Sequence, residues 1–247
     1  MILAVLYVIC LIVGFLGGVA GVGGILLPPA LILLSGLDTH TAMGTALASF
    51  LPLSLLGAWL HHRLGHLNLG VAAPYVLGGL ATAGPGALLN ARVPGGPLVL
   101  LLALLVIFAG FCAFRPPRAG AGGSRFWQSR GGVFLIGALT GLLAGLTGAG
   151  GPVLSIPWMV VAGFPPLSAV ALSMPYQAAT ALSGTVGNWS GGHVDFGLLP
   201  VICLLEMAGF FGGVAAARRI PAWLLRRVIG GICCGLGVFL LVRELMS

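Results

Sequence analysis

The hydrophobic pattern of the chain consists of long apolar runs separated by short polar stretches. The runs at residues 97–114 and 133–146 carry no charged side chain. They approach the roughly 20 residues that span a hydrocarbon core as a helix. Because runs of this kind recur along the whole chain, we predict an all-α polytopic membrane protein with about eight to ten membrane segments.

The apolar pattern repeats at a constant spacing. Gly21-Val22-Gly23-Gly24 recurs as Gly148-Ala149-Gly150-Gly151, an offset of 127 positions. The same offset holds without a gap for Gly14/Gly141, Gly36/Gly163, Gly57/Gly184, Gly65-His66/Gly192-His193, Arg92/Arg219, Pro94/Pro221 and Gly110/Gly237. Such a sustained register predicts two homologous halves, residues 1–114 and 131–247, joined by a polar linker at 115–130.

Each half begins with a glycine-interrupted apolar segment, at residues 2–35 and 133–162. The central glycines would break a helix, so each segment is either a re-entrant hairpin or a pair of tilted crossings. Three apolar helices follow in each half, at 42–60, 69–89 and 97–114 and at 169–187, 196–216 and 222–242. The first segment lacks the basic start of a signal peptide, so we expect it to be part of the mature protein.

The composition changes this picture little. Hydrophobic residues make up 59% of the chain and charged residues 6%, against roughly 25% charged residues in a soluble domain. The 42 glycines suit close helix packing in a bilayer. The net charge of +7 comes from arginines in short loops, a pattern that sets membrane topology and does not indicate nucleic-acid binding.

The arginines distinguish between two orientations of the halves, because cytoplasmic loops collect basic residues. With the linker in the cytoplasm, parallel halves place six arginines inside and five outside. If each glycine-interrupted segment returns to its own side, the halves are inverted and nine arginines lie inside, leaving only Arg92 and Arg243 outside. We therefore predict inverted repeats with both termini outside, an architecture that recurs among secondary transporters.

Several of these features together resemble the TauE/SafE sulfite exporter family, also grouped as toluene-sulfonate uptake permeases, over nearly the whole chain. They are the glycine motifs at 17–24 and 145–151 with proline-bearing apolar runs after them, the loop from His61 to Asn68, and the stretch from Asn188 to Asp195. The resemblance implies a permease or exporter of small sulfur-containing anions, such as sulfite or organosulfonates, in the bacterial inner membrane. An acidic residue at Glu206 is not implied by it.

The glycine motifs suit an anion site. Backbone N–H groups at a helix N-terminus stabilise an anion without adding a buried charge, and both motifs open an apolar run. We expect helix N-termini of both halves to face an anion near the membrane midplane, unless the glycines only permit close helix crossing. The expected backbone ligands are Gly21, Gly23, Gly24, Gly148, Gly150 and Gly151.

Polar side chains on the next span of each half could complete the pocket. They are Thr45 and Ser49 in the first half and Ser173, Tyr176, Gln177 and Asn188 in the second. Hydroxyl and amide groups can donate hydrogen bonds to an anion, although serine and threonine also bond their own helix backbone. His66 and His193 stand at span ends, which favours an interfacial role.

Glu206 lies near the centre of an apolar segment, where a charged side chain costs a few kcal/mol. It is therefore protonated, paired or turned to a cavity. It either couples proton movement to anion transport or bonds a neighbouring helix. The five cysteines show no ligand spacing, so we expect no metal site and no other cofactor.

Two other functions stay open. A symmetric glycine-lined path could act as a passive anion channel. The stretch Ala181-Leu182-Ser183-Gly184 is one residue short of the Gly-x-Ser-Gly motif of rhomboid-like intramembrane hydrolases, but its serine would need a base, and His193 is ten residues away. We therefore expect that the protein is not an enzyme. The expected partners are a small anion and the lipid bilayer, and the glycine-rich faces are compatible with a homodimer.

Overall fold

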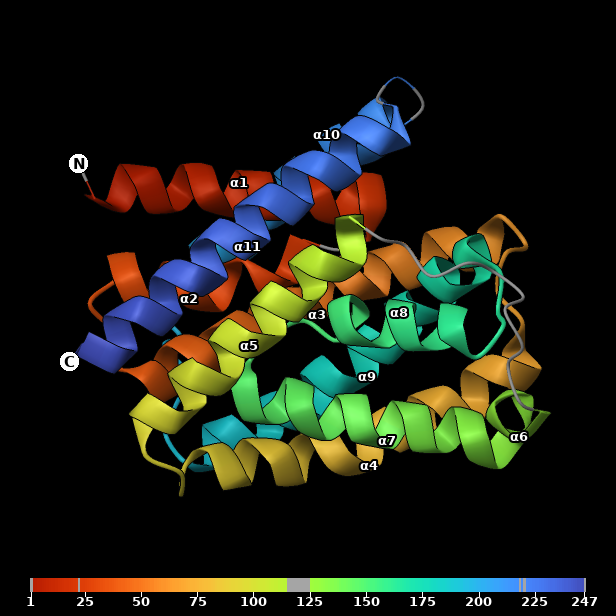
Figure 1. Ribbon diagram of the computed structural model, residues 1–247, viewed down its shortest axis with the longest axis horizontal. Helices are drawn as coiled ribbons and strands as arrows, with labels where there is room; N and C mark the ends of the chain where they lie inside the picture. The colour runs from red at the N-terminus through yellow and green to blue at the C-terminus, as the bar shows by residue number, and fades with distance from the viewer. Residues whose placement is uncertain (1, 22, 115–124, 218, 220, 247) are drawn as a thin grey trace.

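The computed structural model describes residues 2–21, 23–114, 125–217, 219 and 221–246 (Figure 1). In chain order the helices are α1 Ile2–Ala20, the 3-10 turn η1 Gly23–Ile25, α2 Leu27–Leu34, α3 Thr39–Arg63, α4 Leu69–Asn90, α5 Gly95–Phe114, α6 Arg125–Gln128, α7 Arg130–Thr147, α8 Pro152–Val161, α9 Pro166–Ser190, α10 Leu199–Ala216 and α11 Ala222–Met246. The described part of the chain contains no strand. The predicted all-α class is confirmed.

Within the described residues, six helices are long and apolar enough to cross a membrane: α3, α4, α5, α7, α10 and the Arg227–Met246 part of α11. The 25-residue α9 is not one of them. It carries serine, threonine and glutamine and packs against α3, α4 and α8. These helices are those of a multi-pass membrane protein. The predicted total of eight to ten membrane segments stays a prediction.

Helix α3 begins at Thr39, earlier than the apolar run at 42–60 predicts, because a polar cap extends it. The carboxylate of Asp38 accepts hydrogen bonds from the backbone N–H groups of His40 and Thr41, at 3.0 and 3.1 Å, and starts α3. Burial raises the pKa of Asp38, but the hydrogen bonds and the nearby His40 outweigh burial and leave that pKa below its usual value. Asn68 caps α4 in the same way, through the N–H of Gly70.

Both glycine-interrupted segments are broken at their glycines. In the second, the side chain of Gln128, just before α7, donates a 3.1 Å hydrogen bond to the carbonyl of Ala162, just after α8. The two ends of this segment therefore lie together, as Figure 1 shows for α7 and α8. In the first segment, α2 packs against α1.

Contacts across the chain come in pairs related by the offset of 127. Gly18 leaves no room for a side chain against the carbonyl of Phe210, and Gly145 leaves none against the carbonyl of Ala83. In the same way, Gly213 leaves no room for a side chain against the carbonyl of Phe15, and Gly86 leaves none against the carbonyl of Leu142. The described residues with positive φ are also three offset pairs: Gly21/Gly148, Gly36/Gly163 and Gly65/Gly192. A two-fold axis between similar halves produces such pairs, because it replaces each residue of a contact by its partner in the other half.

Helices α5 and α11, which are related by this offset, pack antiparallel. Gly96 at the start of α5 lies against Glu244 at the end of α11, and Gly110 near the end of α5 lies against Cys234. Figure 1 shows both chain termini at one end of the molecule and α6 at the other. We call these the termini end, which includes Thr39 and Asn90, and the linker end, which includes the residues flanking α6. Of the predicted linker, residues 115–124 lie outside the described residues.

Candidate functional site

The two glycine motifs meet inside the molecule. A Cβ atom on Gly24 would lie 3.2 Å from the Cα atom of Gly150, and a Cβ atom on Gly150 would lie 3.3 Å from the Cα atom of Gly24. Backbones approach this closely only where side chains are absent. Motifs that are 127 positions apart in the sequence thus form one backbone centre.

Helix starts flank this centre. Helix α8 begins at Pro152, directly after Gly151, where proline suits the first turn. The N–H groups of Gly150 and Gly151 donate no hydrogen bond to any described residue. In the first half η1 intervenes, and α2 begins at Leu27 with a proline in its first turn. Consecutive prolines at 28 and 29 account for this later start, because proline fits only the first turn of a helix.

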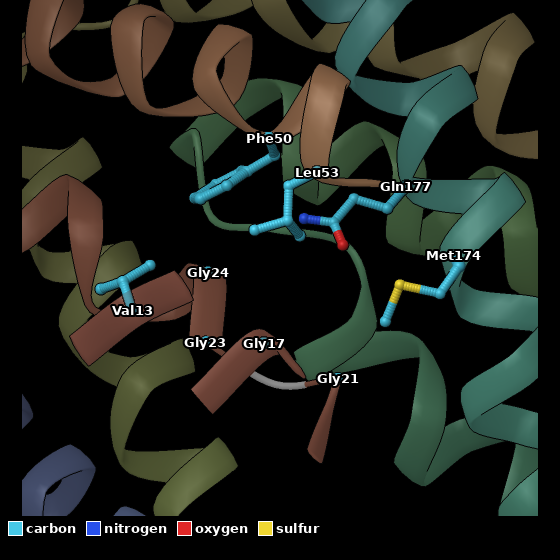
Figure 2. A pocket seen from close by; sticks show the side chains of 9 residues that line it. All are labelled: Val13, Gly17, Gly21, Gly23, Gly24, Phe50, Leu53, Met174 and Gln177. Carbon is cyan, nitrogen blue, oxygen red and sulfur yellow. The ribbon is translucent and has the colours of Figure 1, made fainter. Parts of the chain in front are cut away.

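A small cavity, with room for about one water molecule, adjoins the centre. Its lining consists of Val13, Gly17, Gly21, Gly23, Gly24, Phe50, Leu53, Met174 and Gln177. Figure 2 shows the side chain of Gln177 reaching from α9 toward Leu53 and Phe50. Within the described residues, this amide makes no protein hydrogen bond and is the one polar side chain of the lining. Its Nε2 atom lies 3.0 Å from the position of a Cβ atom on Gly150. The amide and the glycine backbone thus converge.

A wider vestibule of about 1000 Å³, which includes space open to solvent, adjoins the cavity on the side of the linker end. Gly17, Gly21 and Met174 line both spaces. The rest of its lining is mostly apolar, with His61 from the end of α3 as an exception. The vestibule therefore leads from one end of the molecule to residues that line the cavity.

The predicted backbone ligands take different positions. Gly21, Gly23 and Gly24 line the cavity, and Gly150 touches Gly24 beside it. By contrast, Gly148 packs against the backbone of Met43, and Gly151 packs against the ring of Tyr176.

Two predicted side chains, Thr45 and Asn188, lie away from the cavity, in contacts near the termini end. The hydroxyl of Thr45 accepts a 2.9 Å hydrogen bond from the N–H of Asp195. The amide of Asn188 donates to the carbonyl of Gly184 at 3.0 Å, and its Oδ1 atom is buried without a described partner. Neither residue belongs to the cavity lining.

The hydroxyls of Ser49, Ser173 and Tyr176 are also used elsewhere. Ser49 and Ser173 donate to carbonyls of their own helices, at 2.9 and 2.7 Å. The Tyr176 hydroxyl lies 2.7 Å from the hydroxyl of Thr140, and its ring stacks on Tyr75 with the centroids 4.3 Å apart. Gln177 is thus the predicted side chain that the structure places in the cavity.

Sequence reasoning missed the apolar wall of the cavity, including Phe50, Leu53 and Met174. One signal was present in the sequence. Phe50 is the offset partner of Gln177, so an inward position in one half indicates an inward position in the other.

Glu206 lies one layer behind this wall and is fully buried. Its backbone carbonyl packs against Gly14 of α1, next to Val13 of the lining. Its carboxyl group lies near Ser49, but the Ser49 hydroxyl donates to its own helix, and neither carboxyl oxygen has a hydrogen-bond partner among the described residues. Cys10 and Cys203 are also near.

The offset gives a packing context for Glu206. Its partner is Gly79, which leaves room for the ring of Tyr176, and the partner of Tyr176 is the small Ser49. A large tyrosine over glycine at one contact between the halves therefore corresponds to a small serine beside glutamate at the related contact. No group of three or more histidine, cysteine, aspartate or glutamate side chains that could hold a metal occurs among the described residues.

Apolar helices, broken hairpins and an internal cavity with an open vestibule are features of a multi-pass membrane transporter. The chain belongs to the sulfite exporter TauE/SafE family, whose model matches residues 5–240. The resemblance seen in the sequence is confirmed.

Two similar proteins come from Bacillus subtilis (strain 168). The probable membrane transporter protein YdhB is 28% identical over 239 residues, which cover 93% of this chain and 94% of that protein. The probable membrane transporter protein YunE is 28% identical over 246 residues, with 86% and 87% covered. The probable membrane transporter protein ORF9 of a Sinorhizobium species is 37% identical over 105 residues, 42% of this chain and 40% of that protein. No solved structure matches the chain.

Proposed function

We propose that the protein is a secondary transporter that moves small sulfur-containing anions, such as sulfite or organosulfonates, across the bacterial inner membrane. The observation that best supports this proposal is the meeting of Gly24 and Gly150 beside a cavity that contains the amide of Gln177. This centre offers N–H donors and, in its described lining, no charged side chain. Such donors suit an anion at low dielectric, because they bind it without burying a second charge.

We propose that the two halves, residues 1–114 and 131–247, are inverted repeats in the membrane. The exchanged contacts and the antiparallel packing of α5 and α11 support this arrangement. A parallel arrangement would make offset-related helices run in the same direction. With the linker end in the cytoplasm, as the arginines predict, the vestibule opens to the cytoplasm.

Glu206 is the proposed proton-coupling residue. An unpaired carboxyl group inside a membrane protein is expensive, and such groups mark proton relays. Glu206 also lies against two of the helices that line the cavity, with its backbone carbonyl on Gly14 of α1 and its carboxyl group near Ser49 of α3. A change in its protonation can therefore alter the wall without contact between the carboxyl group and the anion.

The hydrolase reading finds no supporting geometry. The Ser183 hydroxyl donates to the carbonyl of Leu80 at 2.7 Å and accepts from the N–H of Gly84 at 3.0 Å, so it joins α9 to α4. The ring of His193 lies 5.2 Å from that of His40 at the termini end.

Reconstitution in proteoliposomes tests the proposed function. Uptake of sulfite, thiosulfate and methanesulfonate is measured over a range of concentrations, with empty liposomes as the control. We expect saturable uptake of at least one of the three anions. Uptake no faster than in empty liposomes, by protein that is monodisperse before reconstitution, would contradict the proposal.

A further inference from the structure

The offset of 127 positions maps the open vestibule onto a second place in the molecule. Each residue of the vestibule lining has an offset partner, and these partners gather at the termini end. They include His40, Met43, Leu47, Asn90, Gly148 and Asn188, the partners of Leu167, Val170, Met174, Ala217, Gly21 and His61.

This second place is closed. A Cβ atom on Gly148 would lie 2.6 Å from the Cα atom of Met43, so the two backbones are in direct contact. At the equivalent position of the vestibule, a Cβ atom on Gly21 would meet only the side-chain tips of Val170 and Met174, at 3.1 Å. The positive-φ glycine thus contacts backbone at the termini end, where it is Gly148, and only side chains at the linker end, where it is Gly21.

Polar bonds hold the closed place together. The fully buried Asn90, at the end of α4, donates a 2.6 Å hydrogen bond to the carbonyl of Leu146 at the end of α7. Because its NH2 group is used in this way, its Oδ1 atom accepts from Nδ1 of His40 on α3, at 3.0 Å. Two hydrogen bonds therefore join three helices.

Among the described residues, no equivalent pair of hydrogen bonds occurs at the offset-related positions of the linker end. The offset partners of Asn90 and His40 are Ala217 and Leu167, whose side chains cannot form hydrogen bonds. Both line the open vestibule. At these offset-related positions, the termini end therefore has hydrogen-bonding side chains and is closed, whereas the linker end has apolar side chains and is open.

We propose that His40, Asn90 and the carbonyl of Leu146 form a gate lock at the termini end. When it breaks, a second vestibule opens there, lined by the offset partners of the first, and the vestibule at the linker end closes. The proposal rests on the proposed transporter function, because alternating access of a central site to two sides is the reason for two vestibules. The structure described above is the state open at the linker end.

Cysteine labelling of the full chain tests the lock. The five native cysteines are replaced, and a single cysteine is introduced as Met174→Cys in the open vestibule or Leu47→Cys at its offset partner. Purified protein in detergent is treated with a hydrophilic maleimide, which reaches both ends. Both residues are buried, but Met174 borders the open vestibule, so we expect Met174→Cys to react faster than Leu47→Cys.

Breaking the lock should reverse this pattern. Asn90→Ala or His40→Ala should speed labelling of Leu47→Cys about tenfold, the population change expected from about one net hydrogen bond, and should slow labelling of Met174→Cys. Leu167→Ala, at the offset partner of His40, is the matched control and should leave the labelling of Leu47→Cys unchanged.

The alternative outcomes are decisive. If Leu47→Cys reacts as fast as Met174→Cys in the parent, the termini end is not closed. If it stays slow in both lock variants, the lock does not hold the gate. His40 is only partly buried, so His40→Ala decides alone if Asn90→Ala fails to fold. Labelling does not require transport, so the two assays test separate proposals. If the flux assay fails but the lock variants reverse the labelling pattern, the proposed substrate class is wrong and the proposed gate lock is supported.

Discussion

Gly150→Ala should weaken anion binding while the protein still folds. The new methyl group would lie 3.0 Å from Nε2 of Gln177 and 3.3 Å from the Cα atom of Gly24. Gly150 is not among the positive-φ glycines, so alanine causes no backbone strain there. The conflict is relieved most easily if the flexible Gln177 side chain moves by a few tenths of an ångström or more, which takes its amide out of line with the anion.

The size of the effect follows from that displacement. A hydrogen bond to a charged group contributes about 1.5–3 kcal/mol, and every 1.4 kcal/mol is about tenfold in affinity. We therefore expect the KM of saturable uptake to rise about tenfold or more, with an unchanged size-exclusion profile. The assay uses whichever of sulfite, thiosulfate or methanesulfonate the parent transports.

The choice of control matters. Gly231→Ala adds a methyl group in α11 with no heavy atom within 4 Å, so it should leave KM unchanged. Gly23→Ala and Gly137→Ala are unsuitable, because their methyl groups would overlap the carbonyls of Val13 and Tyr75. If Gly150→Ala and Gly231→Ala both show the parent's KM, the cavity beside the glycine centre is not the binding site.

Three further predictions concern other parts of the molecule. Glu206→Gln should change the pH dependence of uptake and leave KM for the anion near the parent's value, whereas an unchanged pH profile would make Glu206 a packing residue. Asp38→Ala should lower stability in a thermal melt at pH 7 by about 1 kcal/mol through loss of the α3 cap. Because the pKa of Asp38 is below its usual value in the folded state, this difference should shrink as the pH falls below about 4, and a constant difference would contradict the cap's charge dependence. Single cysteines at the exposed positions Arg125 and Met246 should react with an impermeant maleimide from opposite faces of the membrane, and labelling from one face would refute the inverted topology.

The apolar runs and the constant offset predict most of the helices, because hydropathy and helix-breaking glycines act locally along the chain. The helix start at Thr39 was missed, since it depends on a single capping side chain, Asp38, that lies outside any apolar run, whereas the start of α4 at Leu69 was predicted. Sequence periodicity cannot supply such ends.

The site was predictable where it depends on the backbone and not where it depends on helix orientation. Gly24 and Gly150 could be named because both motifs break helices in the same register. Ser49 and Tyr176, by contrast, are offset partners next to the inward-facing Phe50 and Gln177, and they face away from the cavity lining. One step along a helix turns a side chain by about 100°, and only packing between the halves decides which of two neighbouring residues points inward.

Counterflow in proteoliposomes tests the central claim, that the protein carries a small sulfur-containing anion by alternating access. Vesicles are loaded with a high concentration of unlabelled sulfite, thiosulfate or methanesulfonate and diluted into a trace of the same anion carrying a sulfur radiolabel. A carrier exchanges label for unlabelled anion, so the account predicts a transient accumulation of label above its external concentration. Label that only rises to the external concentration would identify a passive channel, and no entry of any of the three anions would contradict the proposed substrate class.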